Sequence, residues 1–139
     1  MIKELVTDEA LLSTPCEPAT AEDIAVATDL TDTLASLENA GCLAANQIGV
    51  TRGLFAFEDE LGNVRVMANP KVLFGLGADK LEESCLTHEG TSRVTRYIKI
   101  KLSYDEFVDG ELRHRKGEFV GWEAQMIQHM TDHCAGKLV

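Results

Sequence analysis

Apolar residues recur at helical spacing in the stretch that follows Pro18. Thr20 suits the N-cap of this helix, and the acidic side chains of Glu22 and Asp23 suit the positive end of its dipole. Residues 39–41, which include a glycine, are expected to end it. The apolar positions that define the helix are Ile24, Ala27, Leu30, Leu34 and Leu37. The sequence therefore predicts an amphipathic helix near the N-terminus.

The middle of the chain predicts antiparallel strands. Residues 52–57 and 64–68 flank a turn-rich stretch and are typical of a hairpin, and the Asn-Pro pair at residues 69–70 is expected to break its second strand. The Asp-Gly pair at residues 109–110 is a strong signal for a tight hairpin turn. Further strands are expected at residues 71–74, 81–87, 92–97, 98–104, 111–115 and 117–120.

The last part of the chain returns to a helical pattern, and Gly136 is well placed to end that helix. Its apolar residues are Trp122, Ala124, Met126, Ile127 and Met130. A helix, several antiparallel strands and a second helix predict an α+β fold, with the strands packed around the C-terminal helix. At this length, residues 1–139 are expected to form a single domain.

Composition and charge narrow the functional classes. The formal net charge of −10 argues against direct binding of nucleic acid or of an anionic membrane surface, because both call for patches of lysine and arginine. No apolar stretch approaches the ~20 residues of a membrane span, and residues 1–5 contain no signal-peptide core, so a cytoplasmic protein is expected. The expected free or metal-binding thiols are Cys16, Cys42, Cys85 and Cys134.

Candidate chemistry begins with His129 and His133, which are four residues apart on the predicted C-terminal helix. This spacing places both imidazoles on one helix face, one turn apart, where they can bind the same metal ion. The alternative is a chance spacing on a surface helix, because the pattern is weak when taken alone.

A second candidate lies in residues 41–50, a loop rich in small residues that allow close approach of the backbone to a ligand or another segment. Gln47 is the one long polar side chain in this apolar setting. Its amide either donates to a bound carbonyl group or simply caps the loop.

Taken together, three stretches resemble the signature motifs of the peptide deformylase family. The stretches are AGCLAANQ at residues 40–47, ESCLT at residues 83–87 and QHMTDH at residues 128–133. The family motifs are approximately GxGLAAxQ, EGCLS and QHExDH. Three motifs in the right order and spacing are far more specific than any one of them, and the resemblance extends along most of the chain.

The resemblance implies a metal site and an oxyanion hole. Cys85, His129 and His133 match the three metal ligands of the family, which leave a fourth position for water. Fe(II) is the expected metal, with Zn, Ni or Co as alternatives. Gln47 and the backbone N–H of Leu86 match the two donors that hold the formyl oxygen.

The resemblance also implies residues that bind an N-formylated peptide. Cys42 replaces a glycine that pairs with the substrate backbone, and Arg96 matches a basic residue near the substrate entrance. A surface arginine on a strand is the alternative for Arg96. Trp122 and Met126 are expected either to line the pocket for a methionine side chain or to pack in the core.

Met130 is the main departure from the family, which has a glutamate directly after the first histidine. That carboxylate serves as general base and general acid, whereas a methionine side chain has no titrating proton. Met130 lies about 60° from His133 on a helical wheel, on the metal's side of the helix. Replacement of the lost group by His88 or Glu89 is an alternative.

Three functions follow from these motifs. The first is a metal-dependent hydrolase that removes the formyl group from N-formylmethionyl peptides, slowed or abolished by Met130. The second is a catalytically inactive relative that binds metal and formyl peptide without turnover. The third is a structural metal protein, against which Gln47 argues because a structural site needs no oxyanion donor.

Overall fold

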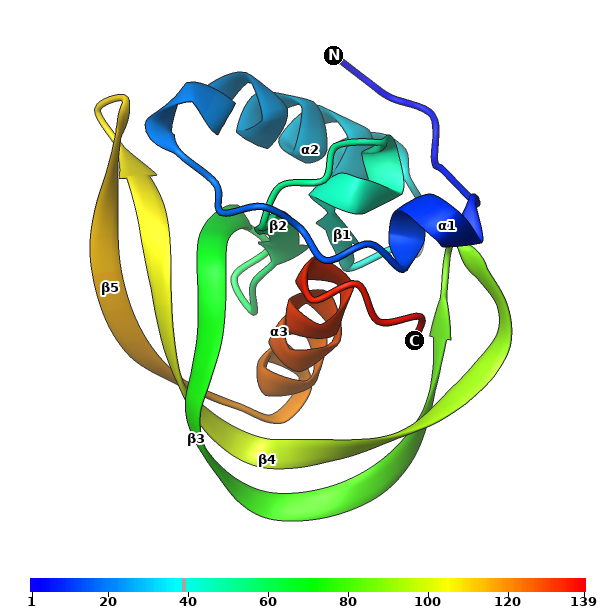
Figure 1. Ribbon diagram of the computed structural model, residues 1–139. Coiled ribbons are helices and arrows are strands. Elements are labelled where there is room, and N and C mark those ends of the chain that lie inside the picture. Colours follow the sequence, from blue (N-terminus) through cyan, green and yellow to red (C-terminus); the bar gives the residue numbers. More distant parts are fainter. Residues whose placement is uncertain (39) are drawn as a thin grey trace.

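The computed structural model describes residues 1–38 and 40–139, apart from the side chains of His88 and Glu89. It is an α+β fold built on an antiparallel sheet, as predicted (Figure 1). Among these residues, no helix combines the length and apolar character needed to cross a bilayer. The elements in chain order are α1 (Glu9–Leu12), the 3₁₀ turn η1 (Ala21–Asp23), α2 (Ile24–Ser36), β1 (Cys42–Ala44), the 3₁₀ turn η2 (Ala45–Ile48), β2 (Leu54–Glu58), β3 (Val64–Cys85), β4 (His88–Val108), β5 (Glu111–Val120) and α3 (Gly121–Cys134).

The predicted cap starts the 3₁₀ turn η1, which leads directly into the helix α2. The Thr20 hydroxyl accepts a hydrogen bond from Glu22 N, and the Asp23 carboxylate accepts one from Thr20 N at 2.9 Å. This reciprocal pair satisfies two backbone donors that the first turn would otherwise leave unpaired. The helix α2 ends at Ser36, before the predicted stop, and Asn39 lies outside the described residues.

Five strands form one sheet in the order β1-β2-β3-β4-β5, and every neighbouring pair is antiparallel. The predicted hairpin is confirmed, since Leu54 pairs with Ala68 and Glu58 with Val64. The predicted turn at residues 109–110 is also confirmed, because both residues have positive φ and join β4 to β5. In Figure 1 the long β3 and β4 ribbons curl around α3. The last residue of β3, Cys85, lies 3.3 Å from His133 of this helix.

Two sequence-based expectations about these strands were wrong. Residues 69–70 do not end the strand, because Asn69 adopts a φ of 51° and makes an irregularity within β3. Its side-chain amide bonds to both backbone polar groups of Ala19, at 2.8 and 3.0 Å, which stabilises the bend. Residues 41–50 are not simply a loop, since they contain the edge strand β1 and the turn η2.

The two long helices cover opposite faces of β2, because alternate residues of a strand point to opposite sides. Leu54 and Ala56 pack with α2 residues, whereas Phe55 and Phe57 pack with α3 residues. The buried side chains on each of these two faces form an apolar core, and the core on the side of Phe55 and Phe57 holds α3 firmly against the sheet. The histidines on α3 therefore have a rigid support.

Candidate active site

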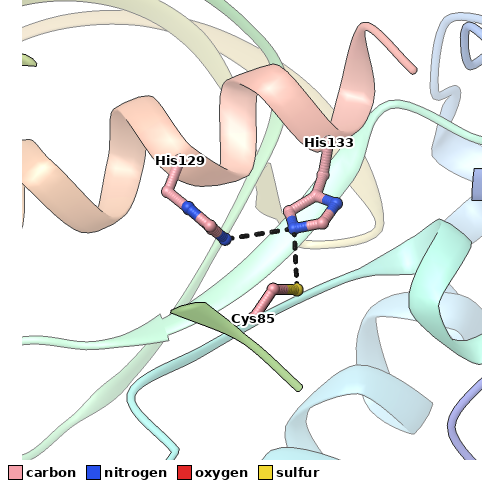
Figure 2. A group of neighbouring side chains, drawn as sticks. All are labelled: Cys85, His129 and His133. Carbon is pink, nitrogen blue, oxygen red and sulfur yellow. Dashed lines mark hydrogen bonds between the residues drawn. The ribbon is translucent and has the colours of Figure 1, made fainter. Parts of the chain in front are cut away.

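Cys85, His129 and His133 come together at one point, where the end of β3 meets α3 (Figure 2). His133 Nε2 lies 3.3 Å from Cys85 Sγ and 3.1 Å from His129 Nε2. All three donor atoms lie within 4.8 Å of one another. Ordinary metal–ligand lengths and tetrahedral angles require N···N and N···S separations of about 3.4 and 3.6 Å. The two separations from His133 Nε2 are close to these values, so one thiolate and two imidazoles are grouped as the ligands of a single metal ion would be.

Hydrogen bonds and charges around Cys85 favour its thiolate form, which is the form that binds metal ions. Burial alone raises the pKa of the Cys85 thiol, but hydrogen bonds from His129 and His133 outweigh burial and lower this pKa to about 5. Burial lowers the pKa of His129, but its bonds to Cys85 and Glu83 outweigh this effect and raise the pKa to about 9. Cys85 is accordingly a thiolate at neutral pH, which is the form that binds a metal ion.

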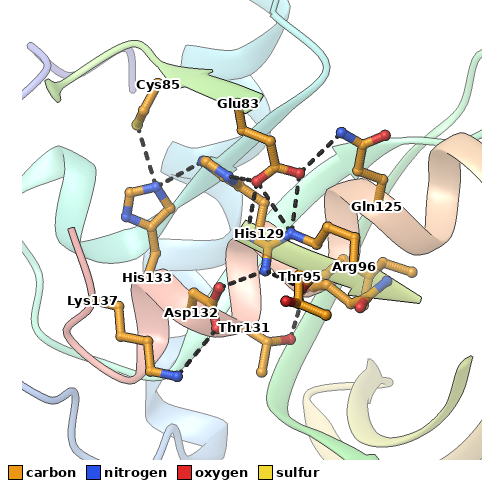
Figure 3. A network of polar contacts seen from close by, with 12 residues as sticks. Glu83, Cys85, Thr95, Arg96, Gln125, His129, Thr131, Asp132, His133 and Lys137 are labelled. Atoms are coloured by element: carbon orange, nitrogen blue, oxygen red, sulfur yellow. Dashed lines mark hydrogen bonds and ion pairs between the residues drawn. The ribbon is translucent and has the colours of Figure 1, made fainter. Parts of the chain in front are cut away.

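A buried carboxylate holds His129 in place (Figure 3). Glu83 Oε1 lies 2.8 Å from His129 Nδ1, and since a carboxylate only accepts, this ring nitrogen donates. The bond leaves Nε2 facing Cys85 and His133. Burial raises the pKa of Glu83, but hydrogen bonds from His129, Arg96 and Gln125 outweigh burial and lower this pKa to about 2. Glu83 is therefore a permanently charged anchor.

Arg96 bonds to this anchor but does not itself line the pocket. Its guanidinium bonds to Glu83 at 2.7 Å and to Asp132 at 2.8 Å, and the side chain is 6% exposed. Lys137 approaches Asp132 from the outside at 3.7 Å. The structure thus places the Arg96 side chain in a buried ion-pair network and not on the surface. Its role in binding substrate stays a prediction.

Gln47 is aimed at the cluster. Its side-chain oxygen accepts a hydrogen bond from Ala44 N at 2.9 Å, which fixes the orientation of the amide. The amide nitrogen consequently faces Cys85 Sγ at 3.2 Å and Thr87 Oγ1 at 3.1 Å. At 1% exposure, Gln47 is a buried donor beside the metal ligands.

A pocket of about 380 Å³ opens onto these groups. The predicted site residues that line it are Cys42, Gln47, Cys85, Leu86, Trp122, Met126, His129 and Met130. Met126 and Met130 also belong to the α3 core, whereas Trp122 is 66% exposed at the mouth. Met126 and Met130 therefore belong to the core and to the pocket wall at once, whereas Trp122 lines the pocket without packing in the core.

No carboxylate of the described residues replaces the missing glutamate beside the metal ligands. Glu83 is occupied by three donors, and Asp132 by two cations. Glu82 lines the pocket, but it is an exposed residue. The side chains of His88 and Glu89 lie outside the described part of the chain.

Two supporting residues were missed from sequence. Asn46 donates to the backbone oxygen of His133 at 2.9 Å, and Gln125 donates to Glu83 at 2.9 Å. Gln125 precedes His129 by four residues and so shares its helix face, a signal that was available. Asn46 carries no local signal, because its partner is 87 residues away.

Comparison with known proteins places this geometry in a family. The model of the polypeptide deformylase family matches residues 2–139. A peptide deformylase from Clostridium beijerinckii is 40% identical over the full length of both chains. One from Chlorobium phaeobacteroides is 32% identical and aligns with 96% of this chain and 74% of its own length.

Solved structures agree with these sequence relationships. The crystal structure of peptide deformylase from Thermus thermophilus superposes with a TM-score of 0.85 at 29% identity, covering 99% of this chain and 83% of that one. A peptide deformylase from Acinetobacter baumannii, described as bound to Met-Ala-Ser, has the same fold, with a TM-score of 0.83 at 22% identity over 99% of this chain and 97% of that one. With its Cys-His-His metal site, this chain belongs to the peptide deformylase family of metal-dependent hydrolases.

Proposed function

We propose that this protein removes the formyl group from N-formylmethionyl peptides, using one ferrous ion held by Cys85, His129 and His133. The observation that carries this proposal is the buried Gln47 amide, whose nitrogen faces the three ligands. The same nitrogen lies 3.1 Å from Thr87 Oγ1, so the chain holds this donor beside the ligands, where it could bind the oxygen of a formyl group. A single domain over residues 1–139 and a cytoplasmic location remain predictions from sequence.

The bound metal supplies the Lewis acidity that makes water nucleophilic at neutral pH. The side chains and backbone of the protein hold the substrate oxygen and position the metal ligands. Gln47 Nε2 and the backbone N–H of Leu86 hold the oxygen of the formyl group as negative charge develops on it. Glu83 keeps His129 in the tautomer that leaves Nε2 free for the metal.

The chain has no proton-transferring side chain at the position where the family has its glutamate. Met130 lines the pocket at 1% exposure, so it occupies the region where the family has its glutamate. A thioether can neither take a proton from water nor give one to the departing amine. General acid–base catalysis contributes about 10²–10⁴-fold, and we propose that turnover is lower by a factor in this range.

The pocket supports a peptide substrate that begins with methionine. Its wall is largely apolar, and Met126, 3% exposed, contributes to it from α3. Trp122 offers an exposed indole at the mouth for contact with residues that follow the methionine. The Met-Ala-Ser of the Acinetobacter structure is a peptide of this kind.

A second candidate function is binding of formyl peptide without turnover, and Met130 is the observation that favours it. Formate release from a formylmethionyl tripeptide, measured under anaerobic conditions with ferrous iron, separates the two. We expect slow release that falls by about 10²–10³-fold in Gln47→Leu. Release should be unchanged in Met67→Leu, a buried substitution at a residue that does not line the pocket. Peptide binding by calorimetry without any formate release would leave binding as the function.

A further inference from the structure

The helix α3 places a polar side chain, Gln125, in the wall of the active-site pocket. Trp122, Gln125 and His129 are three and four residues apart, so they follow one face of the helix. All three line the pocket, and they change from exposed through half-buried to buried in this order. Gln125 therefore lies between the mouth of the pocket and the metal ligands.

The orientation of the Gln125 amide is fixed by Glu83. Gln125 Nε2 lies 2.9 Å from Glu83 Oε2. Because a carboxylate only accepts hydrogen bonds, the amide nitrogen must face Glu83, and the amide oxygen Oε1 faces away from it (Figure 3). Glu83 is itself held by His129 at 2.8 Å and by Arg96 at 2.7 Å, so the amide cannot turn over without losing a bond to a firmly placed charge.

The amide oxygen of Gln125 is an acceptor without a partner. Among the described residues, the buried side-chain atoms that lack a hydrogen bond are Asn46 Oδ1 and His133 Nδ1. Gln125 Oε1 is not one of them, and no described residue donates to it, so this atom is accessible. Since Gln125 lines the pocket, its oxygen is placed to accept a hydrogen bond from a molecule bound there.

The first side chain of a formyl peptide reaches the level of Gln125. For hydrolysis the formyl carbon must lie beside the metal ligands, and only the amide nitrogen separates it from the first Cα. A side chain as long as that of methionine or glutamine extends about 5 Å from Cα. One turn of α-helix rises 5.4 Å, and Gln125 lies about one turn before His129.

We propose that Gln125 is a specificity-determining residue, whose amide oxygen accepts a hydrogen bond from the first side chain of the peptide, so that the protein also deformylates peptides that begin with glutamine. Glutamine matches methionine in length but ends in an N–H donor, which methionine lacks. The reaction is unchanged, since water adds to the formyl carbon, the C–N bond breaks, and formate and the free α-amine leave. This inference rests on the proposed deformylase function and adds a substrate class to it.

The test compares formyl-Gln-Ala-Ser with formyl-Met-Ala-Ser, using the full chain loaded anaerobically with ferrous iron. Gln125→Met keeps the length of the side chain but removes the acceptor. We expect the ratio of kcat/KM for the glutamine peptide to that for the methionine peptide to fall by about tenfold in this variant, because the substrate amide then lacks its acceptor. The lost bond to Glu83 affects both peptides alike and cancels in the ratio.

A matched control is Thr131→Val, which removes a polar group from α3 at a residue that does not line the pocket. It should leave the ratio as in the parent. The affinities of the zinc-loaded chain for the two peptides, measured by calorimetry, give a second readout that does not depend on turnover. Their ratio should shift in the same direction in Gln125→Met.

Two results would overturn the inference and leave the proposed function intact. One is a ratio in Gln125→Met that stays within about twofold of the parent's in both readouts. The other is binding and formate release with the methionine peptide but neither with the glutamine peptide. Neither binding nor release with either peptide would instead contradict the proposed function, and the inference with it.

Discussion

Removal of the Glu83 charge tests how the metal site is held together. Glu83→Gln preserves the size of the side chain but places an amide NH₂ among donors from His129, Arg96 and Gln125. At least one of these donors then faces another donor in a buried region. His129 loses its anchor, and Arg96 keeps only Asp132 as a charged partner.

The expected cost follows from two independent arguments. Removing one partner of a buried ion pair costs about 3–5 kcal/mol, and the remaining bond from Arg96 to Asp132 reduces this to about 2–4 kcal/mol. The folded chain lowers the pKa of Glu83 from 4.5 to about 2 despite its burial, because His129, Arg96 and Gln125 donate to it. At about 1.4 kcal/mol per pH unit, this difference also corresponds to about 3 kcal/mol.

The pH dependence gives the sharper assay. A carboxylate whose pKa is lowered by folding contributes its full stability above the unfolded pKa of 4.5, and loses it as the pH falls toward about 2. Urea denaturation of the parent and of Glu83→Gln, followed by circular dichroism, should show a gap of about 3 kcal/mol at pH 7 that narrows steadily below about pH 4.5. A gap of the same size at pH 7 and at pH 3 would refute this reasoning.

Three further substitutions separate the roles of individual side chains. Gln47→Leu removes the oxyanion donor and should lower kcat/KM for a formyl peptide by about 10²–10³-fold, whereas an unchanged rate would exclude that role. Gly136→Ala should destabilise the fold by about 2 kcal/mol, because the φ of Gly136 is 78° and the new Cβ would lie 2.7 Å from Pro15 N. An unchanged midpoint in urea denaturation would contradict this. Trp122→Ala should leave stability within about 0.5 kcal/mol, since the ring is 66% exposed, but raise KM; a large loss of stability would show that the ring packs in the core.

Local signals in the sequence predicted the parts of the fold that depend on neighbouring residues. The Thr20 cap and the turn at residues 109–110 both appear where expected, because each is stabilised by atoms within a few positions. The length of β3 could not be predicted in this way, since the bend at Asn69 is held by Ala19 and Asp105, which lie 50 and 36 residues away.

At the metal site too, residues with a local sequence pattern were predictable, whereas contacts between residues far apart in the chain were not. His129 and His133 were found because two histidines one helix turn apart carry a local pattern, whereas Cys85 was assigned as a ligand by the resemblance of residues 83–87 to a family motif. Arg96 was expected on the surface or at the substrate entrance, and its burial depends on Asp132, far along the chain. Whether the pocket side chains bind substrate as the family motifs imply stays a prediction.

The most direct measurement compares kcat/KM of the parent and of Met130→Glu for one formylmethionyl peptide, both loaded anaerobically with ferrous iron. Met130 is 1% exposed in the pocket beside Cys85 and His129, so a carboxylate placed there reaches the site of proton transfer. We expect the variant to be faster by about 10²–10⁴-fold, which is the usual contribution of a general acid–base group. A parent that already turns over as fast as Met130→Glu would contradict the conclusion that this site lacks its proton carrier.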